Sequence, residues 1–190
     1  MSKAVLMSVS PKQCYNIASG KQTVIVSKTK PKIETPFKVY IYCTIGKSQK
    51  DMLFFAKHDK ETFVGEYLAN GKVIGEFVCD KIDGFNYGVH EPYGATNWQD
   101  CYKGYPEELY DMEDTCLTVK EINNYGSGRF LYAWHISNIV IYDKPKGLDY
   151  FSKYIDCHRG KTCYDCVGCW DCQVTRPPQS WFYVEERDDT

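Results

Sequence analysis

The sequence predicts an α+β fold built on a strongly bent, mainly antiparallel sheet or small β-barrel with short flanking helices. Three observations in the 190 residues support this class. Runs of apolar, β-branched and aromatic residues recur along the chain, helix signals are few and short, and strands and helices do not alternate regularly. The 16 tyrosines suit sheets with half-buried faces. We expect one domain over residues 1–190.

The first half of the chain begins with a predicted strand over 4–9. Ser10 can cap a helix that starts at Pro11 and ends near Ser19, with Gly20 after it. Further strands are predicted over three ranges, 23–27, 37–44 and 72–82. Residues 46–70 are polar and variable, and no element is assigned to them.

The second half opens with a long irregular excursion over 83–115, either functional or ornamental. Thr118 and Glu121 form a T-x-x-E capping box for a short helix ending near residue 126. Residues 129–143 are the longest β run and predict one long strand or two bent segments. A final strand is predicted over 179–186.

Charge is distributed unevenly along the chain. Residues 1–50 hold nine Lys and one acidic residue, Glu34, for a net charge of +8, whereas the remainder carries −10. This asymmetry predicts either a positive face for a polyanion or lysines that only solvate exposed strand edges.

No apolar stretch approaches the roughly 18 residues that a membrane-spanning helix needs, and no signal-peptide pattern opens the chain. We therefore expect a cytoplasmic monomer without membrane attachment. Reduced thiols are then favoured over a disulfide framework. Cys43 and Cys79, inside apolar runs, are expected to be small buried thiols.

A second group of cysteines lies in a predicted insertion, 155–174, before the last strand. A structural zinc site of zinc-knuckle type is the favoured interpretation, with even intervals between the ligands Cys157, Cys163, Cys166 and Cys172. Cys169 or His158 could replace one ligand. An iron–sulfur cluster, or cysteines without metal, are the alternatives.

No dinucleotide-binding, P-loop, nucleophile-elbow or zinc-protease motif occurs in the sequence. Four segments instead resemble the ASCH domain of the PUA-like superfamily: LMSVSPKQCYNIASGKQTVIVSKTKP (6–31), GKVIGEFVCDKI (71–82), LYAWHISNIVIYDKPKGL (131–148) and TRPPQSWFYVEE (175–186). The chain looks most like ASCH proteins of prophages and mobile elements. The resemblance implies a small PUA-like barrel and an RNA- or nucleoside-related role, and some small members hydrolyse acetylated cytidine.

The sequence departs from the family signature G-x-K-x-x-E-x-R. Gly20 is retained, but Gln22, Ile25 and Ser27 replace the Lys, Glu and Arg. Gln cannot supply the nucleophilic or basic nitrogen of Lys, so the family's hydrolysis is not expected. Lys21 is adjacent, but a shift of one residue along a strand points its side chain to the opposite face.

The resemblance places a binding cleft between the first helix, the following strand and the barrel wall. The candidate ligand-binding residues there are Lys12, Lys21, Gln22, Ser27, Lys28 and Lys30. Lysines would contact phosphates, and Gln22 and Ser27 a base edge. In the alternative interpretation, Lys28 and Lys30 only solvate a turn.

A second candidate group lies on the long predicted strand and before the last one. Alternation puts Trp134 on one face, and His135 and Ser137 on the other. Trp134 could stack a base or belong to the core, and His135 could bind a ligand or be structural. Arg176 could hold a phosphate or form a salt bridge that fixes its turn.

The sequence thus predicts a non-catalytic ASCH protein that binds RNA or a nucleotide and contains structural zinc. One alternative is a nucleoside-modifying hydrolase with a rearranged site. The other is a mobile-element module that binds and blocks a host protein through residues 83–115.

Overall fold

The computed structural model describes residues 2–46, 48–59, 62–86, 112–154 and 172–186. Six strands form the main sheet: β1 (Lys3–Val9), β2 (Val24–Ser27), β3 (Phe37–Cys43), β6 (Val73–Asn86), β7 (Phe130–Lys146) and β8 (Trp181–Glu185). Two more, β4 (Phe54–Asp59) and β5 (Thr62–Leu68), form a separate hairpin. The helices are α1 (Pro11–Ala18) and α3 (Val119–Gly126), with 3-10 turns at Gln49–Asp51, Met112–Thr115 and Leu148–Tyr150.

The main sheet has the strand order β2-β7-β6-β3-β1-β8, and only the β1–β3 pair is parallel among its described pairings. The expected α+β class and antiparallel pairing are confirmed. The expected closed barrel is wrong for the described residues, because no backbone pairing joins β2 to β8. Side chains bridge the two edges instead. Trp181 Nε1 donates to Thr29 Oγ1 at 3.0 Å, and the Tyr183 hydroxyl accepts from Lys32 N at 2.6 Å.

Alternating side chains divide the sheet into an inner and an outer face. The inner face holds the main core, to which α1 contributes Cys14 and Ile17 and β7 contributes Trp134. On the outer face, α3 covers β2 and β7 through Ile122. A third cluster around Tyr40, Phe151 and Val184 covers the outer face of β3, β1 and β8. Because both faces are covered there, β1, β2 and β3 are nearly continuous apolar, buried runs.

Local signals account for the start of α1. The Ser10 hydroxyl accepts from Gln13 N at 3.4 Å, and Pro11 occupies the first turn, where no intrahelical N–H bond is needed. Gly20 follows with a φ of +71°, a conformation in which glycine has no steric penalty. The predicted helix is confirmed, and Cys14 and Ile17 are its buried residues.

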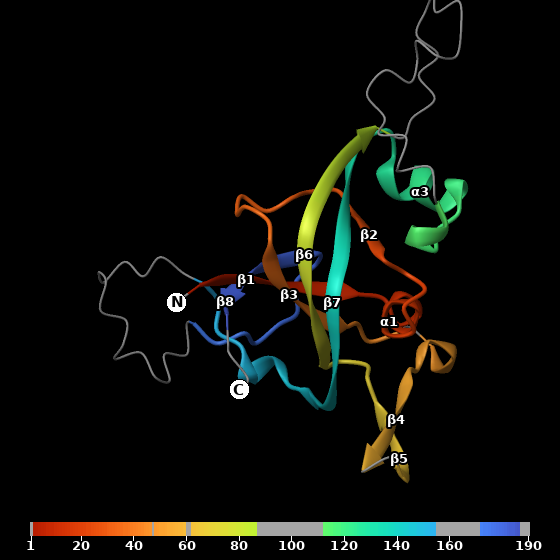
Figure 1. The fold of residues 1–190 in the computed structure, drawn as a ribbon, viewed down its shortest axis with the longest axis vertical. Coiled ribbons are helices and arrows are strands. Elements are labelled where there is room, and N and C mark those ends of the chain that lie inside the picture. The colour runs from red at the N-terminus through yellow and green to blue at the C-terminus, as the bar shows by residue number, and fades with distance from the viewer. Residues whose placement is uncertain (1, 47, 60–61, 87–111, 155–171, 187–190) are drawn as a thin grey trace, which may run out of the picture.

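The β4–β5 hairpin occupies the segment to which the sequence assigned no element. It projects beyond the main sheet at the end opposite α3 (Figure 1). Phe55 and Tyr67 pack against the main core, and the Tyr67 hydroxyl donates to the Tyr142 carbonyl at 3.0 Å. Contacts with the distant β7 therefore anchor this hairpin.

Strands β6 and β7 are the longest strands that the structure describes (Figure 1). β7 is a single strand of 17 residues, and register shifts accompany its bending along β6. The predicted excursion 83–115 is therefore shorter at both ends: 83–86 continue β6, and 112–115 form a 3-10 turn. Residues 87–111 lie outside the described residues. Among the helices that the structure describes, none is long and apolar enough to cross a membrane.

Candidate functional site

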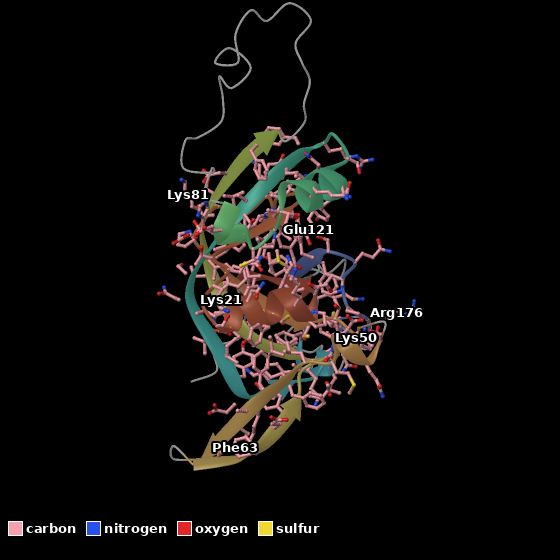
Figure 2. The ribbon with its side chains drawn as sticks, turned by 90° about the vertical axis from the view of Figure 1, so that its right-hand side faces the viewer. Lys21, Lys50, Phe63, Lys81, Glu121 and Arg176 are labelled. Carbon is pink, nitrogen blue, oxygen red and sulfur yellow. The ribbon has the colours of Figure 1, made fainter. Side chains whose placement is uncertain are left out.

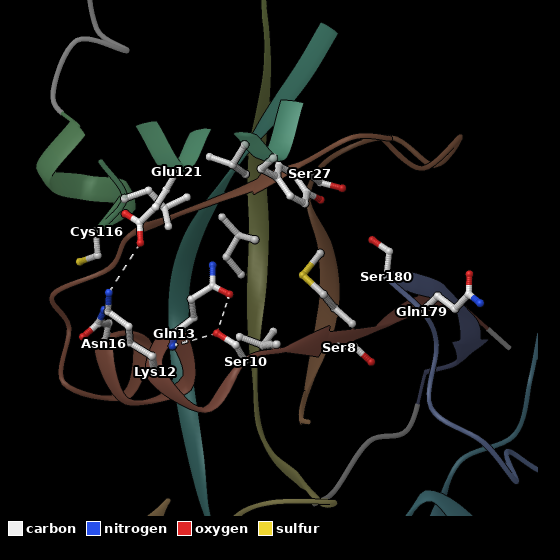
Figure 3. Close-up of a pocket in the computed structure, with 16 residues that line it drawn as sticks. Ser8, Ser10, Lys12, Gln13, Asn16, Ser27, Cys116, Glu121, Gln179 and Ser180 are labelled. Atoms are coloured by element: carbon white, nitrogen blue, oxygen red, sulfur yellow. Dashed lines mark hydrogen bonds and ion pairs between the residues drawn. The ribbon is translucent and has the colours of Figure 1, made fainter. Parts of the chain in front are cut away.

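A cleft of about 350 Å³ opens where the sheet fails to close, between β2 and the adjacent ends of β1 and β8 (Figure 3). Helix α1 lies along one side of it, and α3 with the preceding turn lies along another. Residues from five separate parts of the chain line the cleft: Met7, Ser8, Val9, Ser10, Lys12, Gln13, Asn16, Ile25, Val26, Ser27, Cys116, Leu117, Glu121, Tyr125, Gln179 and Ser180.

Uncharged hydrogen-bonding side chains dominate the polar part of this lining. Four of them are already engaged. The Ser8 hydroxyl donates to the Pro178 carbonyl at 2.6 Å, the Ser10 hydroxyl donates to Gln13 Oε1 at 2.9 Å, and Ser27 Oγ accepts from Thr29 N at 3.4 Å. In the described part of the chain, the side chains of Asn16, Gln179 and Ser180 form no hydrogen bond. These groups remain available to a ligand.

The two charged residues in the described lining face each other across the cleft mouth. Lys12 Nζ lies 4.0 Å from Glu121 Oε1, and both side chains are well exposed, so the pair contributes little stability. Glu121 Oε2 accepts from both Thr118 N and the Thr118 hydroxyl at 2.8 Å. These capping hydrogen bonds hold the pKa of Glu121 below its usual value, with Lys12 as a smaller cause, and Glu121 is therefore a carboxylate at neutral pH.

Tyr125 supplies the aromatic ring of the cleft wall. Burial raises the pKa of its hydroxyl, so the residue is a neutral phenol at neutral pH. Lys28 Nζ lies 4.7 Å from the centre of this ring, which places a positive charge beside the cleft. The cleft therefore combines an aromatic ring with an apolar floor, formed by Met7, Val9 and Ile25, and with polar groups around it.

Cys116 lies at the junction of α3 and the cleft in a left-handed backbone conformation, with a φ of +51°. Its thiol donates to the carbonyls of Lys21 and Glu113 at 3.4 and 3.6 Å. These contacts tie the turn before α3 to the segment that follows α1.

The structure brings together only some of the predicted ligand-binding residues. Lys12 and Ser27 line the cleft, and Lys28 lies beside it through its contact with Tyr125. Lys21 is exposed and does not line the cleft. Lys30 lies further along the chain, with Nζ 5.7 Å from the Tyr132 ring centre.

Gln22 does not line the cleft, contrary to its predicted role at a base edge. It is 1% exposed, and its Nε2 donates to the Val24 carbonyl at 3.0 Å. Its Oε1 has no hydrogen-bond partner among the described residues. Gln22 lies between the end of α1 and the start of β2.

Trp134 is a core residue, which corrects its candidacy for base stacking. It is fully buried, its ring centre lies 5.7 Å from those of Phe37 and Trp181, and its Nε1 has no partner within the described residues. Its strand position on the inner face leaves neither side of the ring open to a ligand.

His135 and Ser137 lie away from the cleft on β7. His135 Nε2 lies 2.7 Å from Asp83 Oδ2, and Lys81 Nζ lies 3.0 Å from the same oxygen. The Ser137 hydroxyl donates to the Val78 carbonyl at 3.0 Å. Both side chains thus have structural partners on β6.

Arg176 is exposed in the turn before β8 and lies at the edge of the molecule (Figure 2). It does not line the cleft, and it forms no ion pair with the residues that the structure describes.

Of the proposed metal ligands, only Cys172 is described, whereas Cys157, Cys163 and Cys166 lie outside the described residues. Within the described ranges, no group of three or more His, Cys, Asp or Glu side chains could hold a metal ion.

Sequence reasoning did not identify several residues of the cleft. They are Gln13, Asn16, Cys116, Glu121, Tyr125, Gln179 and Ser180. The capping box predicts Glu121 only as a helix residue, and Gln179 and Ser180 open the strand predicted over 179–186. No local pattern links these segments, because the curl of the sheet brings them together.

No protein-family model matches the chain, and no curated protein sequence matches it. The fold does match solved structures. The crystal structure of ASCH from Zymomonas mobilis aligns with a TM-score of 0.54 and 15% identity, covering 96% of this chain and 88% of that one. Two single-residue variants of the Zymomonas mobilis protein give the same TM-score and identity. The Tyr-to-Phe variant covers 97% of this chain and 92% of its own, and the Ser-to-Ala variant covers 96% and 89%. The chain therefore has the ASCH fold.

Proposed function

We propose that this protein binds a nucleotide or a short RNA segment in the cleft between α1, β2 and α3, and that it does so without catalysis. The observation that carries this proposal is a ring of uncharged hydrogen-bonding groups, several without partners, above an apolar floor. A volume of about 350 Å³ is at the small end of ligand sites, which suits a single nucleotide better than a duplex.

The lining offers groups for each part of a nucleotide. The amides of Asn16 and Gln179 can both donate and accept, as the edge of a base requires. The Ser180 hydroxyl can bind a ribose hydroxyl. Lys12 at the cleft mouth and Lys28 beside the cleft can contact phosphate as point charges. Figure 3 shows Gln13 extending from α1 between Glu121 on one side and Ser180 on the other. The general association of the ASCH domain with RNA supports the same ligand class.

A hydrolytic role has less support from this cleft. At the signature positions, Gln22 is buried outside the lining and Ile25 is apolar. Glu121 is held ionised by its capping hydrogen bonds and would be a poor general acid at neutral pH. Binding alone therefore accounts best for the residues that the cleft presents.

A cleft-filling substitution tests the proposal directly. Ser180→Trp places a bulky ring into the cleft from an exposed position, whereas Thr175→Trp places the same ring on the same segment outside the lining. Isothermal titration calorimetry with nucleoside 5′-monophosphates and short RNAs should show binding by the unmodified protein and by Thr175→Trp. Ser180→Trp should weaken binding by about tenfold or more, which corresponds to about 1.4 kcal/mol.

Two results would contradict the proposal. If the folded protein binds none of these ligands at low salt, the predicted protein-interaction module becomes the leading alternative. Equal loss of affinity in Ser180→Trp and Thr175→Trp would place the ligand elsewhere. Thermal unfolding of each variant must first show that it is folded.

A further inference from the structure

Beside the cleft, the inner face of the sheet continues beyond the hydrophobic core and becomes exposed to solvent. Along β7, alternate residues on this face change from fully buried Trp134 to half-buried Tyr132 and then to Phe130, which is 50% exposed. Tyr132 is paired with Ser27, a cleft residue, in the β2–β7 register. The exposed end of this face is thus continuous with the cleft wall.

One lysine accompanies these rings, and a second lies over the neighbouring cleft wall. Lys30 Nζ lies 5.7 Å from the Tyr132 ring centre, and Lys28 Nζ lies 4.7 Å from that of Tyr125. The rings of Phe130 and Tyr132 pack edge to face, with centres 5.3 Å apart. We call Lys28, Lys30, Phe130 and Tyr132 the lysine–aromatic strip.

The backbone of β6 fixes the ring of Phe130. A Cβ on Gly84 would lie 2.5 Å from Cε1 of Phe130, so the absence of a side chain at Gly84 allows the ring to lie directly against the strand. The ring is therefore held in place while half of its surface faces solvent. A pre-ordered aromatic surface loses little conformational freedom on binding.

We propose that the lysine–aromatic strip binds a single-stranded RNA segment that continues from the nucleotide held in the cleft. This inference rests on the proposed function and names its ligand as a strand of several nucleotides. Exposed aromatic rings stack unpaired bases, and interleaved lysines contact the phosphates between them. In duplex RNA the bases are stacked on one another and cannot reach such rings, so an unpaired strand is required.

Charge favours this occupant over a peptide with few acidic residues and over a second protein surface. Residues 26–33 contain three lysines and no acidic residue, and Arg129, next to Phe130, is exposed. A strand of phosphates spaced along these cations complements the charge, and the rings supply the contacts that phosphates cannot make.

The test compares one nucleotide with a strand. Uridine 5′-monophosphate and single-stranded octauridylate are titrated against the protein and against Phe130→Ala and Phe130→Leu, the latter keeping apolar bulk without an aromatic face. Phe63→Ala is the matched control, because Phe63 is 57% exposed on the hairpin, far from Glu121 and the cleft (Figure 2). An octamer of the same backbone without bases serves as the charge control.

We expect octauridylate to bind at least tenfold more tightly than the monophosphate and than the abasic octamer. Both Phe130 variants should weaken octauridylate binding by roughly tenfold and leave monophosphate affinity unchanged. Phe63→Ala should change neither. Lys28→Ala combined with Lys30→Ala should also reduce the salt dependence of octamer binding, with log K against log salt flattening by about 0.7 for each lost phosphate contact.

The outcomes separate this inference from the proposed function. Two results would contradict RNA binding by the strip while leaving nucleotide binding in the cleft supported. In one, the monophosphate binds but the octamer binds no more tightly. In the other, folded Phe130→Leu loses no more octamer affinity than Phe63→Ala. If neither ligand binds the unmodified protein, the proposed function fails and the strip fails with it. Equal affinity for octauridylate and the abasic octamer would show attraction by charge alone and overturn the stacking role.

Discussion

Burial changes the chemistry of single residues in this sheet, and Cys79 is the clearest case. It is fully buried on β6, and burial, with a smaller contribution from Asp80, raises the pKa of its thiol to about 12. The thiol of an unfolded chain ionises near pH 8.5. As pH rises, the unfolded state therefore releases its proton first, and the free energy of unfolding should fall between about pH 9 and pH 12. Urea unfolding across that range, followed by circular dichroism, measures the decline.

Cys79→Ala is the control for this pH dependence. Burial also raises the pKa of Tyr42, Tyr67 and Tyr125, so these residues contribute a decline of the same sign. Removing the Cys79 thiol should make the decline shallower without abolishing it. An identical slope in the variant would show that Cys79 ionises equally in the folded and unfolded states.

Trp134 contributes to the core through shape and position. It is fully buried between Phe37 and Trp181. Trp134→Ala should lower the free energy of unfolding by about 3–5 kcal/mol, because a large cavity remains that its neighbours cannot fill. Trp134→Phe should cost less, since a ring still occupies the site. A loss below about 1 kcal/mol for Trp134→Ala in chemical denaturation would contradict the core assignment.

At the scale of elements, the capping box of α3 connects helix stability to the cleft. The Thr118 hydroxyl accepts from Glu121 N at 3.2 Å, and α3 carries Glu121 and Tyr125 into the lining. Thr118→Ala should destabilise the protein by about 1 kcal/mol. It should also weaken nucleotide binding, because the first turn of α3 would fray. Thermal unfolding and calorimetry on the same samples measure both effects.

Thr175→Ala provides the comparison for this prediction, since Thr175 is exposed and lies outside the cleft lining. It should leave both stability and binding near those of the unmodified protein. If Thr118→Ala changed stability but not binding, α3 would be a structural cover rather than a wall of the site.

Individual elements differ in how far local sequence specifies them. α1 and α3 are short, but each begins with a capping residue and was predicted close to its observed bounds. The β4–β5 hairpin has no comparable signal. Its charged residues interrupt the alternation, a register shift divides its pairing, and its packing depends on β7. Nothing within residues 46–70 alone indicates which side chains of this hairpin will be buried.

At the scale of the whole molecule, the cysteine segment before β8 remains a prediction from the sequence. We propose that Cys157, Cys163, Cys166 and Cys172 bind one structural zinc ion. Metal analysis of purified protein should then find about one zinc per chain. Removing the metal with a chelator should lower the melting temperature, since binding of a structural zinc stabilises the fold.

Substitutions within this segment distinguish the ligands. Cys163→Ser and Cys166→Ser should each lower zinc content and melting temperature, whereas Cys169→Ser should have little effect on either. A folded protein without zinc or iron would contradict the site. Equal losses in Cys169→Ser would show that the ligand assignment is wrong.

The sequence by itself determined the α+β class, most strands, both helices and their caps, because these depend on periodicity and on contacts between residues close in the chain. It also indicated that α1 and β2 would border a cleft, through the ASCH resemblance, and it included Lys12 and Ser27 among the candidates. It could not decide between two roles for Trp134, since an apolar ring in a strand suits both a core and a stacking surface.

Only the tertiary structure decided how the sheet ends. β2 and β8 meet through side chains rather than a backbone ladder, so the sheet stays open and the gap becomes the cleft. The curl of the sheet also gives inner-face residues of β7 different burial: Trp134 is buried and Phe130 is exposed. Both outcomes depend on pairing between strands far apart in the sequence, such as β1 with β8, and on the angle at which the sheet bends. Local patterns contain neither quantity, because they report which side chains alternate and not where the strand they belong to will lie.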